Sequence, residues 1–194
     1  LYAMAGSGKE ELRLTLAHEL VHALQGQHLP LDSMLRDRSD ADRTAALQAV
    51  LEGHATIASL FVLAPDNSIV EDDATWQLMQ EQFTAPRPTM AKFNSAPLVI
   101  RTGLLFPYVE GTGFMRWLMR NHPGASPFDA LLPQSSEQVI NPERIARGDG
   151  PVAVGFIDDS TDVLHDDTFG EYEMMVLRAS LAGITAVVSG IPLG

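Results

Sequence analysis

His18-Glu19-Leu20-Val21-His22 stands within a stretch that has the pattern of one uninterrupted helix over residues 9–27. Two histidines four residues apart lie on one face of a helix, where both imidazoles can bind the same metal ion. The glutamate beside the first histidine can then reach a water molecule bound to that metal. The pentapeptide therefore predicts a helix that carries a metal site.

The residues around the pentapeptide predict how this helix is oriented. At about 100° per residue, polar residues including His18, His22, Glu19 and Gln25 fall on one side. The other side is broad and apolar, and it consists of Leu12, Leu16, Ala17, Leu20, Val21, Ala23 and Leu24. We therefore expect the leucine side to face the core and the histidine side to face a cleft.

A catalytic zinc site needs a third protein ligand and one open coordination position. Glu52 is the preferred candidate, because it lies on a second predicted helix, which begins at Asp40 or Thr44, ends at Leu63 and is otherwise apolar. A charge buried in such a helix needs a partner. The small residues on the same face are expected to let this helix approach the first one closely, and they are Ala45, Ala49 and Thr56.

Two further histidines compete with Glu52 or lie near it. His28 follows His22 by six residues, which is the spacing of the third histidine in metzincins, although Gly26 stands one place later than the metzincin glycine. His28 is therefore the alternative third ligand. His54 points about 200° away from Glu52 around the helix, so we expect it to pack nearby or to support a ligand rather than to bind the same ion.

Composition narrows the classes of function. The chain of 194 residues has 25 acidic and 13 basic residues and a formal net charge of −12, which argues against nucleic acid and anionic membrane surfaces as partners. It has no cysteine, so any metal must be held by His, Asp or Glu. A chain without cysteine suits either redox compartment. An extracellular or cell-envelope location is slightly favoured over the cytoplasm, and the oligomeric state is not readable.

The remaining patterns indicate a mainly helical α+β fold with minor β-structure. One domain over 1–194 is expected, and the start at Leu1 rather than Met allows that it is shortened at one or both ends. Further helices are expected at residues 72–83, 108–121, 126–132 and 169–189. Residues 152–157 are a strand candidate, and 98–106 are either a short strand or the start of a helix. The apolar stretch 174–192 carries Arg178 and several small residues, which favours a buried helix over a membrane span.

These motifs resemble those of the gluzincins, which are zinc peptidases with two helix histidines and a downstream glutamate. Glu52-Gly53-His54-Ala55 resembles the glutamate motif of their aminopeptidase branch. The chain is more closely similar to a little-characterised group of bacterial proteins with metallopeptidase motifs, in segments that follow the same order at 18–28, 52–56, 106–111, 133–143 and 169–171. That group usually has Asp in place of His54 and His in place of Asn141, and its members tend to be longer at both ends.

The resemblance implies a zincin-like metallopeptidase domain with an active-site helix and a glutamate helix. It implies one Zn²⁺ per chain, held by His18, His22 and Glu52, with Glu19 as the general base. Tyr108 is the preferred donor to the oxyanion that forms during hydrolysis, and it is followed by His122 and His165. Glu137 is a candidate for orienting a metal-bound histidine, and a capping role is equally open to it.

Three functional hypotheses follow. The first is a zinc-dependent peptidase that acts on a peptide or protein substrate. The second is a non-catalytic zinc-binding pseudo-protease that serves as a binding or scaffold domain, and it is motivated by the departures at His54 and Asn141. The third is a helical interaction domain in which the pentapeptide is incidental.

Overall fold

The computed structural model describes residues 8–36, 40–85, 90–154 and 166–184. All regular elements in these ranges are helices, so the mainly helical part of the prediction is confirmed, and no strand occurs among the described residues. The helices are α1 (Lys9–His28), α2 (Leu31–Met34), α3 (Ala41–Leu60), α4 (Ser68–Glu71), α5 (Asp73–Thr84), α6 (Ala91–Asn94), α7 (Leu98–Asn121), α8 (Ser136–Ile140), α9 (Glu143–Ala146) and α10 (Glu171–Leu181).

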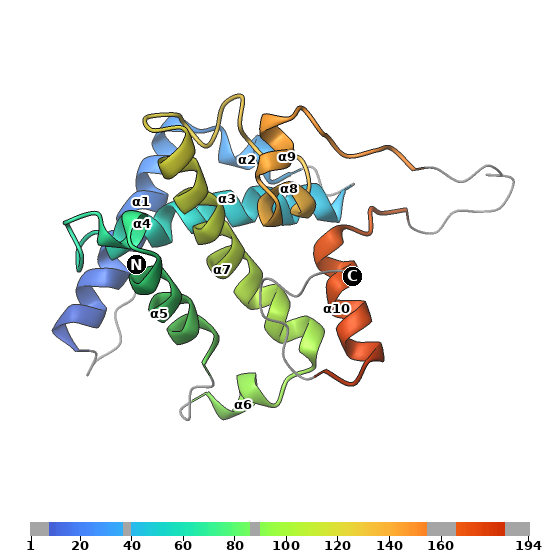
Figure 1. The fold of residues 1–194 in the computed structure, drawn as a ribbon, viewed down its shortest axis with the longest axis horizontal. Coiled ribbons are helices and arrows are strands. Elements are labelled where there is room, and N and C mark those ends of the chain that lie inside the picture. The colour runs from blue at the N-terminus through green and yellow to red at the C-terminus, as the bar shows by residue number, and fades with distance from the viewer. Residues whose placement is uncertain (1–7, 37–39, 86–89, 155–165, 185–194) are drawn as a thin grey trace, which may run out of the picture.

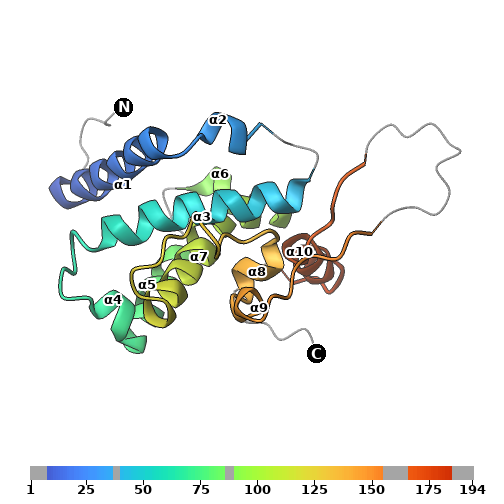
Figure 2. The same cartoon turned by 90° about the horizontal axis from the view of Figure 1, so that it is seen from above.

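The long helix α3 is the centre of the fold, and it lies between α1 and α7 (Figure 1 and Figure 2). Its buried side chains join those of α7 in the main hydrophobic cluster. Each large apolar side chain that is fully buried there stabilises the fold by about 1.5–3 kcal/mol. The most deeply buried apolar residues of this cluster include Val50, Ile57, Phe114, Leu118 and Val139.

Aspartates determine where α3 begins and what its first turn contacts. The Asp40 side chain accepts a hydrogen bond of 2.9 Å from the Arg43 N–H, which satisfies one of the free donors at the helix start. Asp42 is buried, and its two carboxylate oxygens accept from the Ser136 N–H at 3.1 and 3.2 Å. The hydrogen bonds between Asp42 and Ser136 tie the start of α8 to the first turn of α3.

Glycines allow α3 and α7 to touch backbone to backbone. Gly53 and Gly111 are both buried, and a Cβ at Gly111 would lie 2.7 Å from the carbonyl carbon of Ala49 and nearer still to its oxygen. Ala49 was predicted to allow a close approach of α1, but its backbone is where α7 approaches α3 closely instead. The close approach brings Tyr108 of α7 to the same side of α3 as Glu52.

The helix α1 is rotated opposite to the prediction. Gln25 is the buried residue of α1, and it lies on the histidine side. On the leucine side, Leu20 is 64% exposed and Leu24 is 53% exposed. The prediction that the leucine side faces the core is therefore wrong.

The reason for this rotation is the polar surface that α3 presents to α1. Glu52 and the Leu51 carbonyl face α1, and side chains of α1 hydrogen-bond to both. A carboxylate that is partly buried without a partner is costly, and His18 and His22 on the histidine side of α1 pair with it. Polar pairing therefore decides which side of this helix is turned inward.

Other segments also differ from the prediction. Residues 98–106 were predicted as either a short strand or the start of a helix, and they form the first part of the helix α7. Residues 127–131 form turns rather than a helix, and 152–154 lack regular structure, while 155–157 lie outside the described residues. The last helix is shorter than expected and ends at Leu181, with residues 185–189 again outside the described ranges. Within the part of the chain that the structure describes, no helix combines the length and apolar character needed to cross a bilayer.

Candidate metal centre

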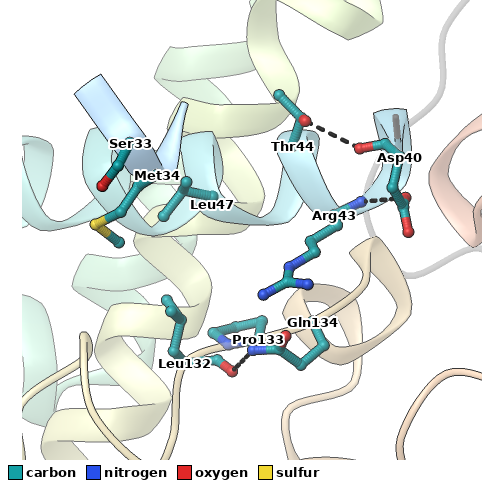
Figure 3. Close-up of a pocket in the computed structure, with 9 residues that line it drawn as sticks. All are labelled: Ser33, Met34, Asp40, Arg43, Thr44, Leu47, Leu132, Pro133 and Gln134. Carbon is teal, nitrogen blue, oxygen red and sulfur yellow. Dashed lines mark hydrogen bonds between the residues drawn. The ribbon is translucent and has the colours of Figure 1, made fainter. Parts of the chain in front are cut away.

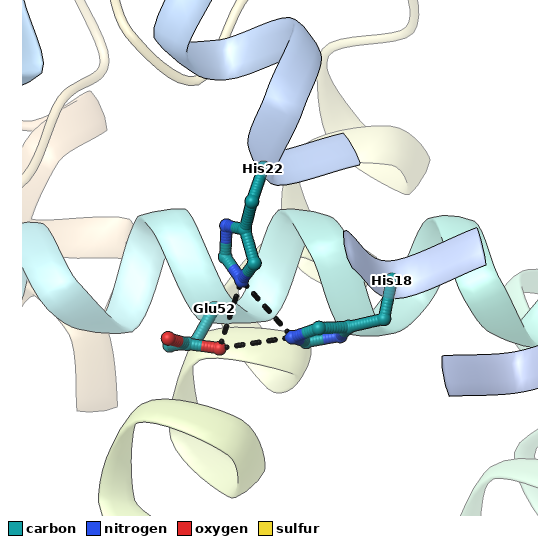
Figure 4. A group of neighbouring side chains, drawn as sticks. All are labelled: His18, His22 and Glu52. Carbon is teal, nitrogen blue, oxygen red and sulfur yellow. Dashed lines mark hydrogen bonds and ion pairs between the residues drawn. The ribbon is translucent and has the colours of Figure 1, made fainter. Parts of the chain in front are cut away.

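Three side chains from α1 and α3 converge on one point (Figure 4). His18 and His22 project from neighbouring turns of α1, and Glu52 projects from the middle of α3. The Glu52 Oε2 atom lies 3.1 Å from His18 Nε2 and 3.3 Å from His22 Nε2, and the two Nε2 atoms are 3.0 Å apart. All three side chains are between 18% and 29% exposed, so the group is partly buried yet open to solvent.

The size of this triangle fits a tetrahedral metal ion. Ligand atoms bound to zinc at about 2.0–2.2 Å are separated from one another by about 3.3–3.6 Å along the edges of a tetrahedron. The three observed distances are equal to or a few tenths of an ångström below that range, a difference that small side-chain rotations remove. Two imidazole nitrogens and one carboxylate oxygen are also a donor set that zinc binds. The residues therefore fit the metal that the sequence predicts, and among the described residues no fourth side chain joins the group.

The electrostatics of the group favour a charged Glu52. Burial raises the pKa of the Glu52 carboxyl, but hydrogen bonds from His18 and His22 and the charges of both imidazoles together outweigh burial and lower the pKa to about 2. The hydrogen bond with Glu52 raises the pKa of His22, and burial opposes this shift. The group thus holds a carboxylate at neutral pH, which is the ionisation state that a metal ligand needs.

Gln25 supports His22 from behind the triangle. Its Oε1 atom lies 2.7 Å from His22 Nδ1, while its Nε2 atom donates to the Leu51 carbonyl at 3.0 Å and lies 3.2 Å from His54 Nδ1. Gln25 was placed on the histidine side by the helical pattern, but no role was predicted for it. Its position three residues after His22, one turn along the same face, was the available signal.

Tyr108 and Glu19 lie beside the three converging side chains. The Tyr108 ring stacks on His18 with 6.1 Å between ring centroids, and its hydroxyl hydrogen-bonds to Glu52. Burial, the charge of Glu52 and this hydrogen bond raise the pKa of Tyr108 above its ordinary value, so the hydroxyl keeps its proton at neutral pH. Glu19 is exposed, and its charge acts on both His22 and Tyr108.

The two histidines that competed for a role near Glu52 lie apart from the triangle. His28 is exposed in the last turn of α1 and is not among the converging ligands. His54 does not converge with Glu52: its Nδ1 lies 3.2 Å from the Gln25 amide nitrogen, and its ring meets Phe128 edge to face at 5.5 Å. Burial, helped by the charge of His22, lowers the pKa of His54.

The remaining candidates that the structure describes lie away from the site. His122 ends α7 and lies against Trp117, with 5.0 Å between ring centroids. Glu137 pairs with Arg144 at 3.1 Å rather than with a ligand histidine. His165 lies outside the described residues. Asn141, where the similar bacterial proteins usually have His, donates to Glu171 at 3.3 Å.

A separate pocket of about 280 Å³ lies between α2, the start of α3 and the segment 132–134 (Figure 3). Arg43 extends across it toward Leu132 and Gln134, and none of the three converging ligands lines it. The group of His18, His22 and Glu52 is therefore distinct from this pocket.

Comparison of the chain with protein-family models, with curated proteins and with solved structures found no match.

Proposed function

We propose that this protein is a zinc-dependent peptidase that hydrolyses peptide bonds in peptide or protein substrates. The observation that carries the proposal is the convergence of His18 Nε2, His22 Nε2 and Glu52 Oε2 within 3.3 Å of one another. A set of two histidines and one carboxylate with an open fourth position belongs to catalytic rather than structural zinc sites. In this proposal, α1 is the active-site helix and α3 the glutamate helix of a zincin-like domain.

The roles of the surrounding residues follow from their positions. When bound, zinc lowers the pKa of water and polarises the substrate carbonyl. The Glu19 carboxylate takes the proton of the attacking water, and it passes that proton to the amine nitrogen as the C–N bond breaks. Tyr108 keeps its hydroxyl proton and donates a hydrogen bond to the oxygen on which negative charge develops.

Metal content is the first test. Purified protein is expected to bind about one zinc per chain, measured by elemental analysis after equilibration with zinc and removal of excess metal. The His22→Gln variant is expected to lose this zinc because one of three protein ligands is gone. His28→Gln is the matched control, since His28 lies on the same helix outside the converging group. A wild-type protein without zinc, or equal zinc in both variants, contradicts the proposal.

The second test separates binding from hydrolysis. Glu19→Gln is expected to retain zinc and to lower the rate of peptide hydrolysis by about 10²–10⁴-fold, because the amide cannot accept the proton. Glu11→Gln changes an exposed glutamate of the same helix and is expected to keep full activity. The substrates are a broad peptide library, analysed by mass spectrometry.

The outcomes of the second test distinguish the alternatives. Hydrolysis that survives in Glu19→Gln refutes the role of this residue. Zinc binding without cleavage of any peptide by the wild type favours the non-catalytic binding domain. Absence of zinc favours a helical interaction domain.

A further inference from the structure

We propose that Gln25 is the positioning residue of the metal centre: its amide holds a proton on His22 Nδ1, so that Nε2, which faces His18 and Glu52, is the nitrogen left to bind a metal ion. The inference rests on the proposed function only where it assigns that nitrogen to zinc. The proton on Nδ1 itself follows from hydrogen bonds that the structure contains without a metal.

The Leu51 carbonyl determines the orientation of the Gln25 amide. A carbonyl oxygen only accepts hydrogen bonds, so the Gln25 atom 3.0 Å from it must be the NH₂ group. The other end of the amide, 2.7 Å from His22 Nδ1, is therefore the oxygen. Because that oxygen can only accept, Nδ1 of His22 must carry a proton. The proton on Nδ1 is thus dictated by a backbone group that cannot reverse its role.

The second N–H of the amide points at His54 Nδ1, 3.2 Å away. This nitrogen accepts, which places the proton of a neutral His54 on its other nitrogen. Both donors and the acceptor of Gln25 therefore have partners, and the side chain is only 4% exposed. A buried amide with every group engaged cannot rotate without losing several hydrogen bonds, each of them expensive to leave unmade.

Gln25 also links the two helices that carry the ligands. It touches the ring of His22 on α1 and the peptide group that immediately precedes Glu52 on α3. One side chain therefore bridges the ring of one ligand and the backbone beside the other. Hydrogen bonds of this kind to metal-bound histidines orient the ring and contribute to metal affinity, and losing one costs about 10–100-fold in affinity.

The test compares Gln25→Met with Gln27→Met. The first removes the buried amide at nearly constant length, and the second makes the same change at an exposed position of the same helix. Zinc dissociation constants are measured by competition with a chromophoric chelator, and no substrate is needed. Gln25→Met is expected to bind zinc about 10–100-fold more weakly than wild type, and Gln27→Met is expected to bind it equally. Equal affinity in both variants overturns the inference and leaves the proposed function intact.

A measurement on the wild type keeps the inference testable if Gln25→Met does not fold. ¹⁵N NMR of the metal-free protein at alkaline pH reports which nitrogen of His22 is protonated, with His22→Gln identifying the signals. The expected result is a protonated Nδ1 and an unprotonated Nε2. The opposite tautomer, or an even mixture, overturns the inference. If the wild type binds no zinc but shows this tautomer, the proposed function fails while the positioning by Gln25 stands.

Discussion

The contact between α3 and α7 makes a sharp prediction for Gly111→Ala. A Cβ at this position would lie 2.7 Å from the Ala49 carbonyl carbon, whereas carbon atoms in contact are about 3.5–4.0 Å apart. Because the obstacle is backbone, no side-chain rotation relieves the clash, and the helices must separate by about 1 Å. Overpacking of this kind costs about 1–3 kcal/mol, occasionally more.

Part of this cost is offset by the better helix propensity of alanine, which contributes up to about 1 kcal/mol. A net destabilisation of about 1–2 kcal/mol lowers the melting temperature of a chain of this length by about 2–8 °C. The separation also moves Tyr108 away from Glu52, so peptide hydrolysis is expected to fall by more than zinc affinity.

Gly113→Ala is the matched control on the same helix. A Cβ there meets its nearest neighbour, the Trp76 ring, at 3.8 Å, which is ordinary contact. Helix propensity alone then operates, and the variant is expected to be as stable as wild type or up to about 1 kcal/mol more stable. Chemical denaturation and thermal melts of metal-free protein measure both variants. If Gly111→Ala is as stable as Gly113→Ala, the backbone contact between α3 and α7 is refuted.

Three further predictions concern the site and its support. Tyr108→Phe is expected to lower the turnover rate by about 10²–10³-fold through loss of one oxyanion donor with zinc affinity unchanged, and an unchanged rate would exclude Tyr108 as the donor. In metal-free protein, the lowered pKa of Glu52 stabilises the fold above pH 4.5, and this contribution is lost as the pH falls toward 2. The raised pKa of His22 stabilises the fold below pH 6.5, and this contribution is lost at higher pH. Melts in the presence of a chelator should therefore show the largest contribution of this pair between pH 4.5 and 6.5, and Glu52→Gln should remove that maximum. Asp42→Ala is expected to cost about 1–3 kcal/mol, because it leaves the buried Ser136 N–H without its acceptor, and a melting temperature equal to wild type would show that another group replaces Asp42.

Much of the local structure could be predicted from the sequence. The helix patterns around His18 and Glu52 predicted α1 and α3 nearly to their ends, because proline after α1 and a capping aspartate before α3 act through neighbouring residues only. The spacing of the two histidines placed both imidazoles on one face of α1, as the structure has them. Glu52 could be named as their partner because a carboxylate in an apolar helix needs one.

The arrangement of these helices could not be predicted in the same way. Periodicity divides α1 into a leucine side and a histidine side, but it does not say which partner the helix meets. Glu52 and the Leu51 carbonyl belong to α3, about thirty residues later in the chain, and their demand for hydrogen bonds turns the histidine side inward and leaves Leu20 exposed. The sequence pattern alone therefore assigned the wrong side to the core.

The same division holds for the candidate site. The residue types and spacing within α1 by themselves determined that a metal site is chemically available, because helix geometry is local. Only the tertiary structure decided that α7 meets α3 at Gly111, which places Tyr108 beside the ligands, and that Gln25 joins His22 to α3. Contacts between segments distant in sequence depend on which surfaces pair most favourably, and that competition has no counterpart in a single helix pattern.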